Sequence, residues 1–198
     1  MIDFKNILKE LEFINISTNE ETIFEWKPAR SYKSFILDLN ILKQNSPVND
    51  IFFHMNKGNL KIAYIRYGKF ICSAGSNVDM QFQLLEALIE EVYRSFNETY
   101  AVDYILSYGN FSPGIFANFK TQVDDLIANF ENLGLVKVIN VPCSACSTIL
   151  PLIIKKSFIK NAESYPVPIV YTHKGHALLA FIDMNYNVRG VELVNMTG

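Results

Sequence analysis

The sequence is poor in the residues that usually mark an oxidising or a membrane environment. Its 198 residues include only three cysteines, an odd count that argues against a disulfide-held fold and favours a reducing compartment. The opening stretch MIDFKNILKELEF has an early acidic residue and no uninterrupted apolar run, unlike a secretory signal. No apolar run approaches the ~20 residues of a bilayer span. We therefore expect a cytoplasmic protein without a transmembrane segment.

Charge is also scarce, and it has no basic excess. Charged residues make up 19% of the chain, with 18 basic and 20 acidic side chains and a formal charge of −2. Nucleic-acid-binding proteins usually show a basic excess or a basic stripe. The nearest feature is Lys155, Lys156 and Lys160, which we interpret as the solvated face of a helix. No nucleic-acid partner is expected.

Known catalytic motifs are missing as well. The chain has no Gly-x-Ser-x-Gly elbow and no His-Glu-x-x-His, and Gly68-Lys69 lacks the flanking residues of a phosphate-binding loop. The acid pairs Glu90-Glu91 and Asp124-Asp125 fall on polar helix faces, where solvation is the simplest interpretation. His54, inside an apolar strand, is typical of a satisfied core histidine. Asp183 is interpreted as a turn acid with a polar role near Arg189.

What the sequence does contain is the pattern of a mixed α/β protein, clearest in its middle. Strands are predicted at 51–55, 60–68 and 69–75, the first two joined by a glycine turn at 57–59. An amphipathic helix follows at 78–96, with Asn77 ahead of it. Its buried stripe is predicted to be Phe82, Leu85, Ile89, Val92, Tyr93 and Phe96. Its solvent-facing side is predicted to be Gln83, Glu86, Glu90 and Arg94.

A second helix is predicted at 115–133, after a strand at 100–109 and a Ser-Pro-Gly turn. Gly134 is placed to end this helix in the left-handed conformation. Its apolar stripe is predicted to be Phe116, Phe119, Val123, Leu126, Ile127 and Phe130. The fold class is therefore α+β, with a central, mainly antiparallel sheet covered by two long amphipathic helices.

The two ends of the chain are predicted as smaller pieces. Ahead of the middle, a helix at 3–14 capped by Asp3 and β-like runs at 22–26 and 35–42 are expected. Behind it, strands are predicted at 135–141, 167–173, 176–183 and 188–194, and a helix at 151–162 with Pro151 at its first position. The predicted domains are an N-terminal segment 1–45, an α/β domain 46–135 and a small β-rich unit 136–198.

The most specific motif is a pair of cysteines followed by a pair of histidines. Cys143 and Cys146 stand at Cys-x-x-Cys spacing behind a strand, and His173 and His176 flank Lys174-Gly175, a plausible two-residue hairpin turn. Two short-spaced ligand pairs can fill the tetrahedron of one structural zinc ion. The alternative is that the cysteines are small buried residues and the histidines turn residues. A thioredoxin-like redox role is a further alternative.

The stretch 51–96, IFFHMNKGNLKIAYIRYGKFICSAGSNVDMQFQLLEALIEEVYRSF, resembles the opening of longin and roadblock modules. Those modules begin with a strand hairpin on a short glycine turn, then a long amphipathic helix, further strands and another helix. The resemblance covers about residues 46–135. It implies a non-catalytic module that binds small GTPases, or dimerises to form a platform for them, in vesicle trafficking and signalling.

We therefore predict a non-enzymatic protein-interaction module, a small-GTPase-associated or trafficking-type scaffold or regulator, able to form a homodimer. The alternative is a small redox or metal-dependent enzyme centred on Cys143, Cys146, His173 and His176. A third interpretation, a zinc-ribbon module contacting nucleic acid, conflicts with the acidic balance of the chain.

Overall fold

The structure is a computed structural model that describes residues 3–29, 48–77, 79–101 and 113–194. The chain divides into two compact units. One comprises Asp3–Leu133, and the other comprises Gly134–Gly198 together with Met1–Ile2. Among the described residues, no helix combines the length and the apolar character that a bilayer crossing requires.

The first unit opens with α1 (Phe4–Leu8), whose first turn is capped by the Asp3 carboxylate. The helix predicted at 3–14 is therefore too long. From Leu11 the chain forms β1 (Leu11–Ser17), which lies between two antiparallel partner strands. Backbone hydrogen bonds on both sides of β1 outweigh the helical spacing of the apolar residues, and Leu11 is fully buried as part of the strand.

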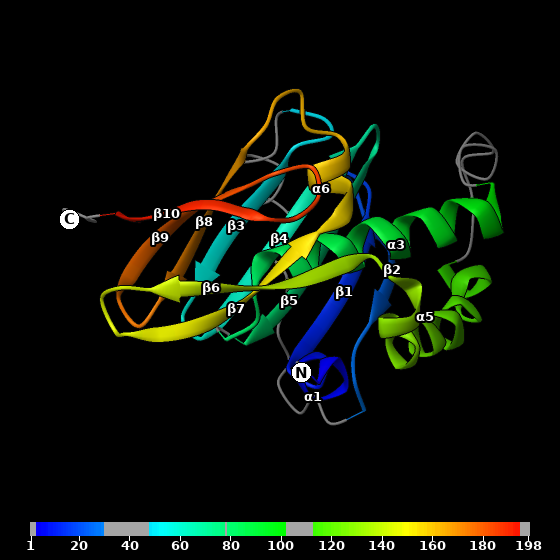
Figure 1. Cartoon of the computed structure of the whole chain (residues 1–198). Helices are drawn as coiled ribbons and strands as arrows, with labels where there is room; N and C mark the ends of the chain where they lie inside the picture. Colours follow the sequence, from blue (N-terminus) through cyan, green and yellow to red (C-terminus); the bar gives the residue numbers. More distant parts are fainter. Residues whose placement is uncertain (1–2, 30–47, 78, 102–112, 195–198) are drawn as a thin grey trace. The chain divides into compact units, whose positions relative to one another are not determined.

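Five strands build the sheet of this unit. They are β1, β2 (Thr22–Trp26), β3 (Phe52–Lys57), β4 (Leu60–Tyr67) and β5 (Phe70–Asn77). The sheet is antiparallel throughout, in the order β2-β1-β5-β4-β3 (Figure 1). The strands predicted at 22–26, 51–55, 60–68 and 69–75 are confirmed. The N-terminal strands, expected in a segment of their own, form one side of the same sheet. The run predicted at 35–42 lies outside the described residues.

Tight glycine turns set the register of the β3–β4–β5 meander. Lys57 pairs with Leu60 around a two-residue turn in which Gly58 has a φ of +59°. Gly68, with a φ of +58°, occupies the equivalent place between β4 and β5. Two-residue hairpins need positive φ, which glycine adopts without steric cost. The turn predicted at 57–59 is confirmed.

The long helix of this unit is α3 (Phe82–Tyr100), which contacts β4 and β5. It begins four residues later than predicted, because Asn77 caps a separate turn through the amide of Asp79 at 2.9 Å. The centre of the predicted stripe is confirmed, since Leu85, Ile89, Val92 and Phe96 are all at most 1% exposed, while Phe82 and Tyr93 are half-buried.

Glu86 was predicted to lie on the solvent-facing side of α3, and this prediction is wrong, because the residue is only 5% exposed. Its carboxylate lies 2.8 Å from Nε2 of His54 on the edge strand β3. A buried charge needs such a partner, and helical spacing alone does not reveal a partner supplied by a strand far away in the sequence.

The single helix predicted at 115–133 is three shorter pieces: η1 (Pro113–Phe116), α5 (Phe119–Ala128) and η2 (Phe130–Leu133). Asn129 ends α5, and its side-chain amide bonds the carbonyl of Asp125 at 2.9 Å. The predicted stripe is buried at Phe116, Phe119, Val123 and Phe130 and half-buried at Leu126 and Ile127. Gly134 follows η2 with the predicted positive φ. Of the strand predicted at 100–109, Tyr100 ends α3, and residues from 102 lie outside the described part.

The second unit is β-rich. It contains β6 (Val136–Cys143), β7 (Thr148–Lys155), the one-turn α6 (Lys156–Lys160), β8 (Val167–His173), β9 (His176–Ile182) and β10 (Val188–Val194). Strands β6 and β7 form one antiparallel pair, and β10-β9-β8 form a three-stranded antiparallel sheet. One core joins both sheets, made of Ile139, Val141, Leu152, Ile154, Ile159, Val167, Ile169, Ala180 and Ile182. The strands predicted here are confirmed.

The helix predicted at 151–162 is wrong over 151–155, where the segment continues as β7, and only Lys156–Lys160 is helical, as α6. Its apolar run fits both helix and strand, and pairing with β6 over eight positions decides the outcome. The predicted solvated lysine face is corrected with it, since Lys155 lies in the strand and is only 4% exposed.

Candidate Cys and His site

The β6–β7 turn holds the two cysteines of the predicted motif. Cys143 is the last residue of β6 and pairs with Thr148 of β7 across a four-residue loop. Ser147 closes that loop with a φ of +51°. Cys143 is 1% exposed and packs with Leu150 and Leu178. A strand end followed by a tight loop thus keeps one cysteine in the core and places the other, Cys146, in the turn.

Cys146 is half-buried, and its thiol has polar neighbours. Its Sγ lies 3.2 Å from Oγ1 of Thr148. The Thr148 hydroxyl and a hydrogen bond from Cys143 lower the pKa of the Cys146 thiol, and the positive charge of Lys174 acts in the same direction. Each of these groups stabilises a thiolate, the nucleophilic form of cysteine.

The two histidines flank the β8–β9 turn as predicted. His173 pairs with His176, and Lys174 and Gly175 form the two-residue turn with φ angles of +45° and +78°. The ring of His173 lies parallel to that of Tyr171, with 6.3 Å between centroids. Nε2 of His173 is buried and has no hydrogen-bond partner.

Both turns lie at the same end of the second unit, as Figure 1 shows for the yellow β6–β7 turn and the orange β8–β9 turn. Cys143, Cys146 and Tyr171 belong to one apolar cluster there. The structure thus brings the cysteine turn and the histidine turn together. Within the described residues, however, no three Cys, His, Asp or Glu side chains are close enough to hold a metal ion. The structural zinc ion therefore stays a prediction.

A shallow hollow of about 370 Å³ lies beside the cysteine turn. It is lined by Pro142, Cys143, Ser144, Ser147, Thr148, Ile149 and Val191. The Ile149 side chain is 71% exposed. The hollow is wide and open enough to admit a small molecule to the turn that carries the thiols.

Sequence reasoning missed the two neighbours that tune Cys146, Thr148 and Lys174. Cys-x-x-Cys spacing gives no signal for the residue two positions beyond the motif. Lys174 was assigned only to a turn, and its approach to Cys146 depends on how two hairpins of the same unit pack together.

In the first unit, His54 lies at the surface rather than in the core, with 38% of its side chain exposed. The ring stacks on Phe82 at 4.0 Å between centroids, and Nε2 bonds to Glu86. These two contacts connect the edge strand β3 to the first two turns of α3. The prediction that this histidine is satisfied is confirmed, and its predicted place in the core is wrong.

One acid of each pair that was predicted to be solvated accepts a hydrogen bond within the protein. Glu91 is 9% exposed and accepts a hydrogen bond from Nε of Arg94 at 3.0 Å. Asp124 accepts one from the indole of Trp26 at 2.7 Å. Both contacts hold helices in place, Glu91 within α3 and Asp124 between α5 and β2.

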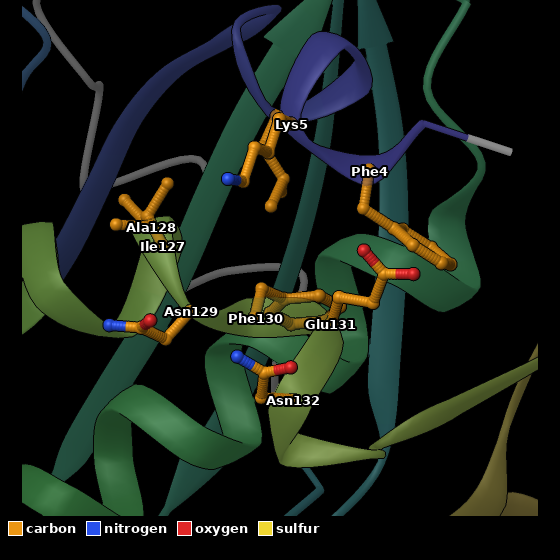
Figure 2. A pocket seen from close by; sticks show the side chains of 9 residues that line it. Phe4, Lys5, Ile127, Ala128, Asn129, Phe130, Glu131 and Asn132 are labelled. Carbon is orange, nitrogen blue, oxygen red and sulfur yellow. The ribbon is translucent and has the colours of Figure 1, made fainter.

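A small cavity of about 140 Å³ lies between α1 and the end of α5 (Figure 2). Phe4 and Lys5 line it from α1, and residues 127–132 line it from the other side. The rings of Phe4 and Phe130 lie 6.0 Å apart.

No protein-family model and no curated protein matches this chain.

Proposed function

We propose that the protein is a non-enzymatic interaction module, a small-GTPase-associated or trafficking-type scaffold, and that the edge strand β3 is its docking surface. The observation that carries the proposal is the position of β3 at one edge of the five-stranded sheet, with half-exposed apolar side chains. Edge strands are natural templates for a strand of another chain.

The backbone pattern of β3 supports this use. Lys57 and Leu60 flank a two-residue turn, so they form a hydrogen-bonded pair, and such pairs recur at every second residue. The alternation directs the backbone groups of His54 and Asn56 away from β4, toward the outer edge. Both side chains are exposed. A partner strand would therefore add to the sheet through these positions.

The side chains around the edge also suit a protein partner. Phe53 and Met55 are half-buried in an apolar cluster with Ile62 and Tyr64 on one face of the sheet. Just ahead of the strand, Val48 and Ile51 are 47% and 51% exposed. Apolar side chains beside an open backbone edge provide the burial that strand addition alone lacks.

Two elements give further support to a longin- or roadblock-like module. The β3–β4 hairpin with its glycine turn and the long helix α3 correspond to the opening of those modules, with β5 between them in this chain. A small GTPase is the partner that the resemblance implies, and a second copy of the chain is the partner in a homodimer.

The test replaces Asn56, whose backbone N–H points away from β4, by proline. Asn56→Pro removes one edge donor without touching the ladder to β4, and Asn56→Ser is the matched control that keeps the donor. We expect the proline variant alone to lose binding to a GTP-loaded or GDP-loaded small GTPase, measured by interferometry over a panel, and to lose self-association in sedimentation velocity. Thermal unfolding should be similar for both variants.

Two results would contradict the proposal. One is partner binding that Asn56→Pro leaves unchanged, which would place the docking surface elsewhere. The other is nucleotide, ester or peptide turnover by the full chain that disappears when one of its own residues is mutated, which would make the protein an enzyme.

A further inference from the structure

We propose that Cys143 and Cys146 form a thiol–disulfide exchange site, in which the β6–β7 turn closes to a reversible disulfide on reaction with a small-molecule disulfide of the glutathione type. The inference concerns the second unit alone, and it holds or fails independently of the docking surface on β3.

The first support is the geometry of the turn. Cys143 and Thr148 are a paired couple at the ends of β6 and β7, and the loop between them is only four residues long. Cys146 packs against the buried cluster that contains Cys143. Both are free thiols. Closure to a disulfide therefore needs a small local adjustment rather than the approach of distant segments.

The second support is that the two thiols have different surroundings, which assigns them different steps. Cys146 is half-buried in the turn, next to the Thr148 hydroxyl at 3.2 Å, and can meet a reagent from solvent. Cys143 is 1% exposed and can reach only its neighbour. Cys146 is thus the attacking sulfur and Cys143 the resolving one.

The exchange balances without any other reagent. The Cys146 thiolate attacks one sulfur of the disulfide, forms a mixed disulfide and releases one thiolate of the reagent. Cys143 then loses its proton and attacks Sγ of Cys146, which releases the second thiolate. Two electrons pass from the cysteine pair to the reagent, which leaves as two thiols.

The chain carries an internal control in its third cysteine. Cys72 lies in β5, is 2% exposed, and its burial raises the pKa of its thiol. The same reagent that oxidises the pair should leave Cys72 reduced. Selectivity within one molecule distinguishes a built site from general oxidation.

To test the proposal, the full-length protein is treated with a chelator and is then equilibrated in buffers of defined reduced-to-oxidised glutathione ratio. Acid quenching, alkylation and peptide mass spectrometry then identify each cysteine. We expect the free-thiol count to fall from three to one, with a Cys143–Cys146 disulfide and alkylated Cys72. Cys146→Ser should prevent the bond, and Cys143→Ser should stop the reaction at a stable mixed disulfide on Cys146.

Three results would overturn the proposal. The first is a mixed disulfide on Cys146 that persists in the unmodified sequence. The second is three free thiols under conditions that oxidise an unstructured Cys-x-x-Cys peptide. The third is stoichiometric zinc in the protein as purified, protecting both cysteines and lost in His173→Ala, which would assign the pair to the predicted metal site instead.

Discussion

Cys72 of the first unit and Cys146 of the second have opposite surroundings. Cys72 lies in a central strand of a sheet backed by a long helix, out of reach of solvent. Cys146 lies in a turn, with its thiol next to the Thr148 hydroxyl. Cys143, the other cysteine of the second unit, is also buried, at the end of strand β6. The accessibility of each thiol therefore follows from the element that carries it: the two strand cysteines are buried, and the turn cysteine is half-buried.

The units also differ in what stabilises them. The first unit depends on a broad aromatic and aliphatic core under α3, with ring pairs such as Phe96–Phe119 at 5.1 Å. The second unit depends on two small sheets and tight turns, in which Ser147, Lys174 and Tyr186 adopt positive φ. The first unit should therefore respond most to core substitutions, and the second to changes in its turns.

The largest expected effect is that of Leu85→Asp in the first unit. Leu85 is fully buried on α3, so the substitution places an unpaired charge in the core. We expect a loss of about 4–5 kcal/mol or more in the free energy of unfolding, measured by urea denaturation with circular dichroism. Leu85→Met, which keeps the volume, is the control and should lose about 1.5 kcal/mol or less. A mild effect of the aspartate would show that this helix face is wrongly placed.

A smaller but still large effect is expected for Gly75→Ala on β5. An added Cβ would lie 2.1 Å from Cε1 of Phe13, a ring that is itself 1% exposed and has little room to move. We expect a loss of about 1–3 kcal/mol in stability from overpacking. Gly58→Ala meets no atom within 4 Å but has positive φ, so it should cost about 1–2 kcal/mol. Urea denaturation of both variants measures the difference, and a neutral Gly75→Ala would refute close packing of β1 on β5.

A moderate effect is expected for Trp26→Phe, which removes the indole donor to Asp124 and keeps an aromatic ring on β2. The lost bond to a charged acceptor should lower the free energy of unfolding by about 1.5–3 kcal/mol. Asp124→Asn, which retains an acceptor, should cost less. If the two substitutions cost the same, the indole bond does not determine how β2 meets α5.

The smallest effect is a pH dependence in the second unit. The backbone amide of Asn187, first among several partners, lowers the pKa of Asp183 to about 2. Because this folded-state pKa lies below the ordinary value of about 3.9, the carboxylate stabilises the β9–β10 turn at neutral pH. That contribution is present above about pH 4 and is lost as pH falls toward 2.

Hydrogen exchange of the β9–β10 hairpin amides, measured at neutral pH and near pH 3, detects this change. After division by the intrinsic exchange rate at each pH, we expect lower protection at the lower pH in the unmodified sequence. Asp183→Asn should show lower protection already at neutral pH, with little further change on acidification. An identical pH response in both proteins would show that another group is responsible.

Most of the correct sequence predictions depended on local signals. Gly58 and Gly175 marked two-residue turns, and apolar, β-branched and aromatic residues marked the strands around them. The failures arose where an apolar run was compatible with two structures. Residues 151–155 became a strand because β6 is available to pair with them, and Leu11 became a strand residue because it pairs with Ser76 of β5. Those partners are long-range, so no local period reveals them.

In the candidate site, too, the local features could be predicted and the features that depend on tertiary packing could not. Each half of the Cys/His motif was predicted correctly as a turn, because its spacing and its Lys-Gly dipeptide are local. That both turns meet at one end of the second unit depends on the packing of two sheets, and so does the approach of Lys174 to Cys146. The prediction could name the residues, but it could not rank a thiol pair against a four-ligand metal site.

The sheet order has a consequence for synthesis of the chain. Strand β1 is made early but lies between β2 and β5, and Ile14 pairs with Ala74. On the ribosome, an early β1–β2 hairpin would therefore present an open edge until Asn77 has left the exit tunnel. Such a delay lengthens the time in which an unpaired edge can join another chain. The N-terminal hairpin is thus a segment whose inner edge stays unpaired until β5 has been made.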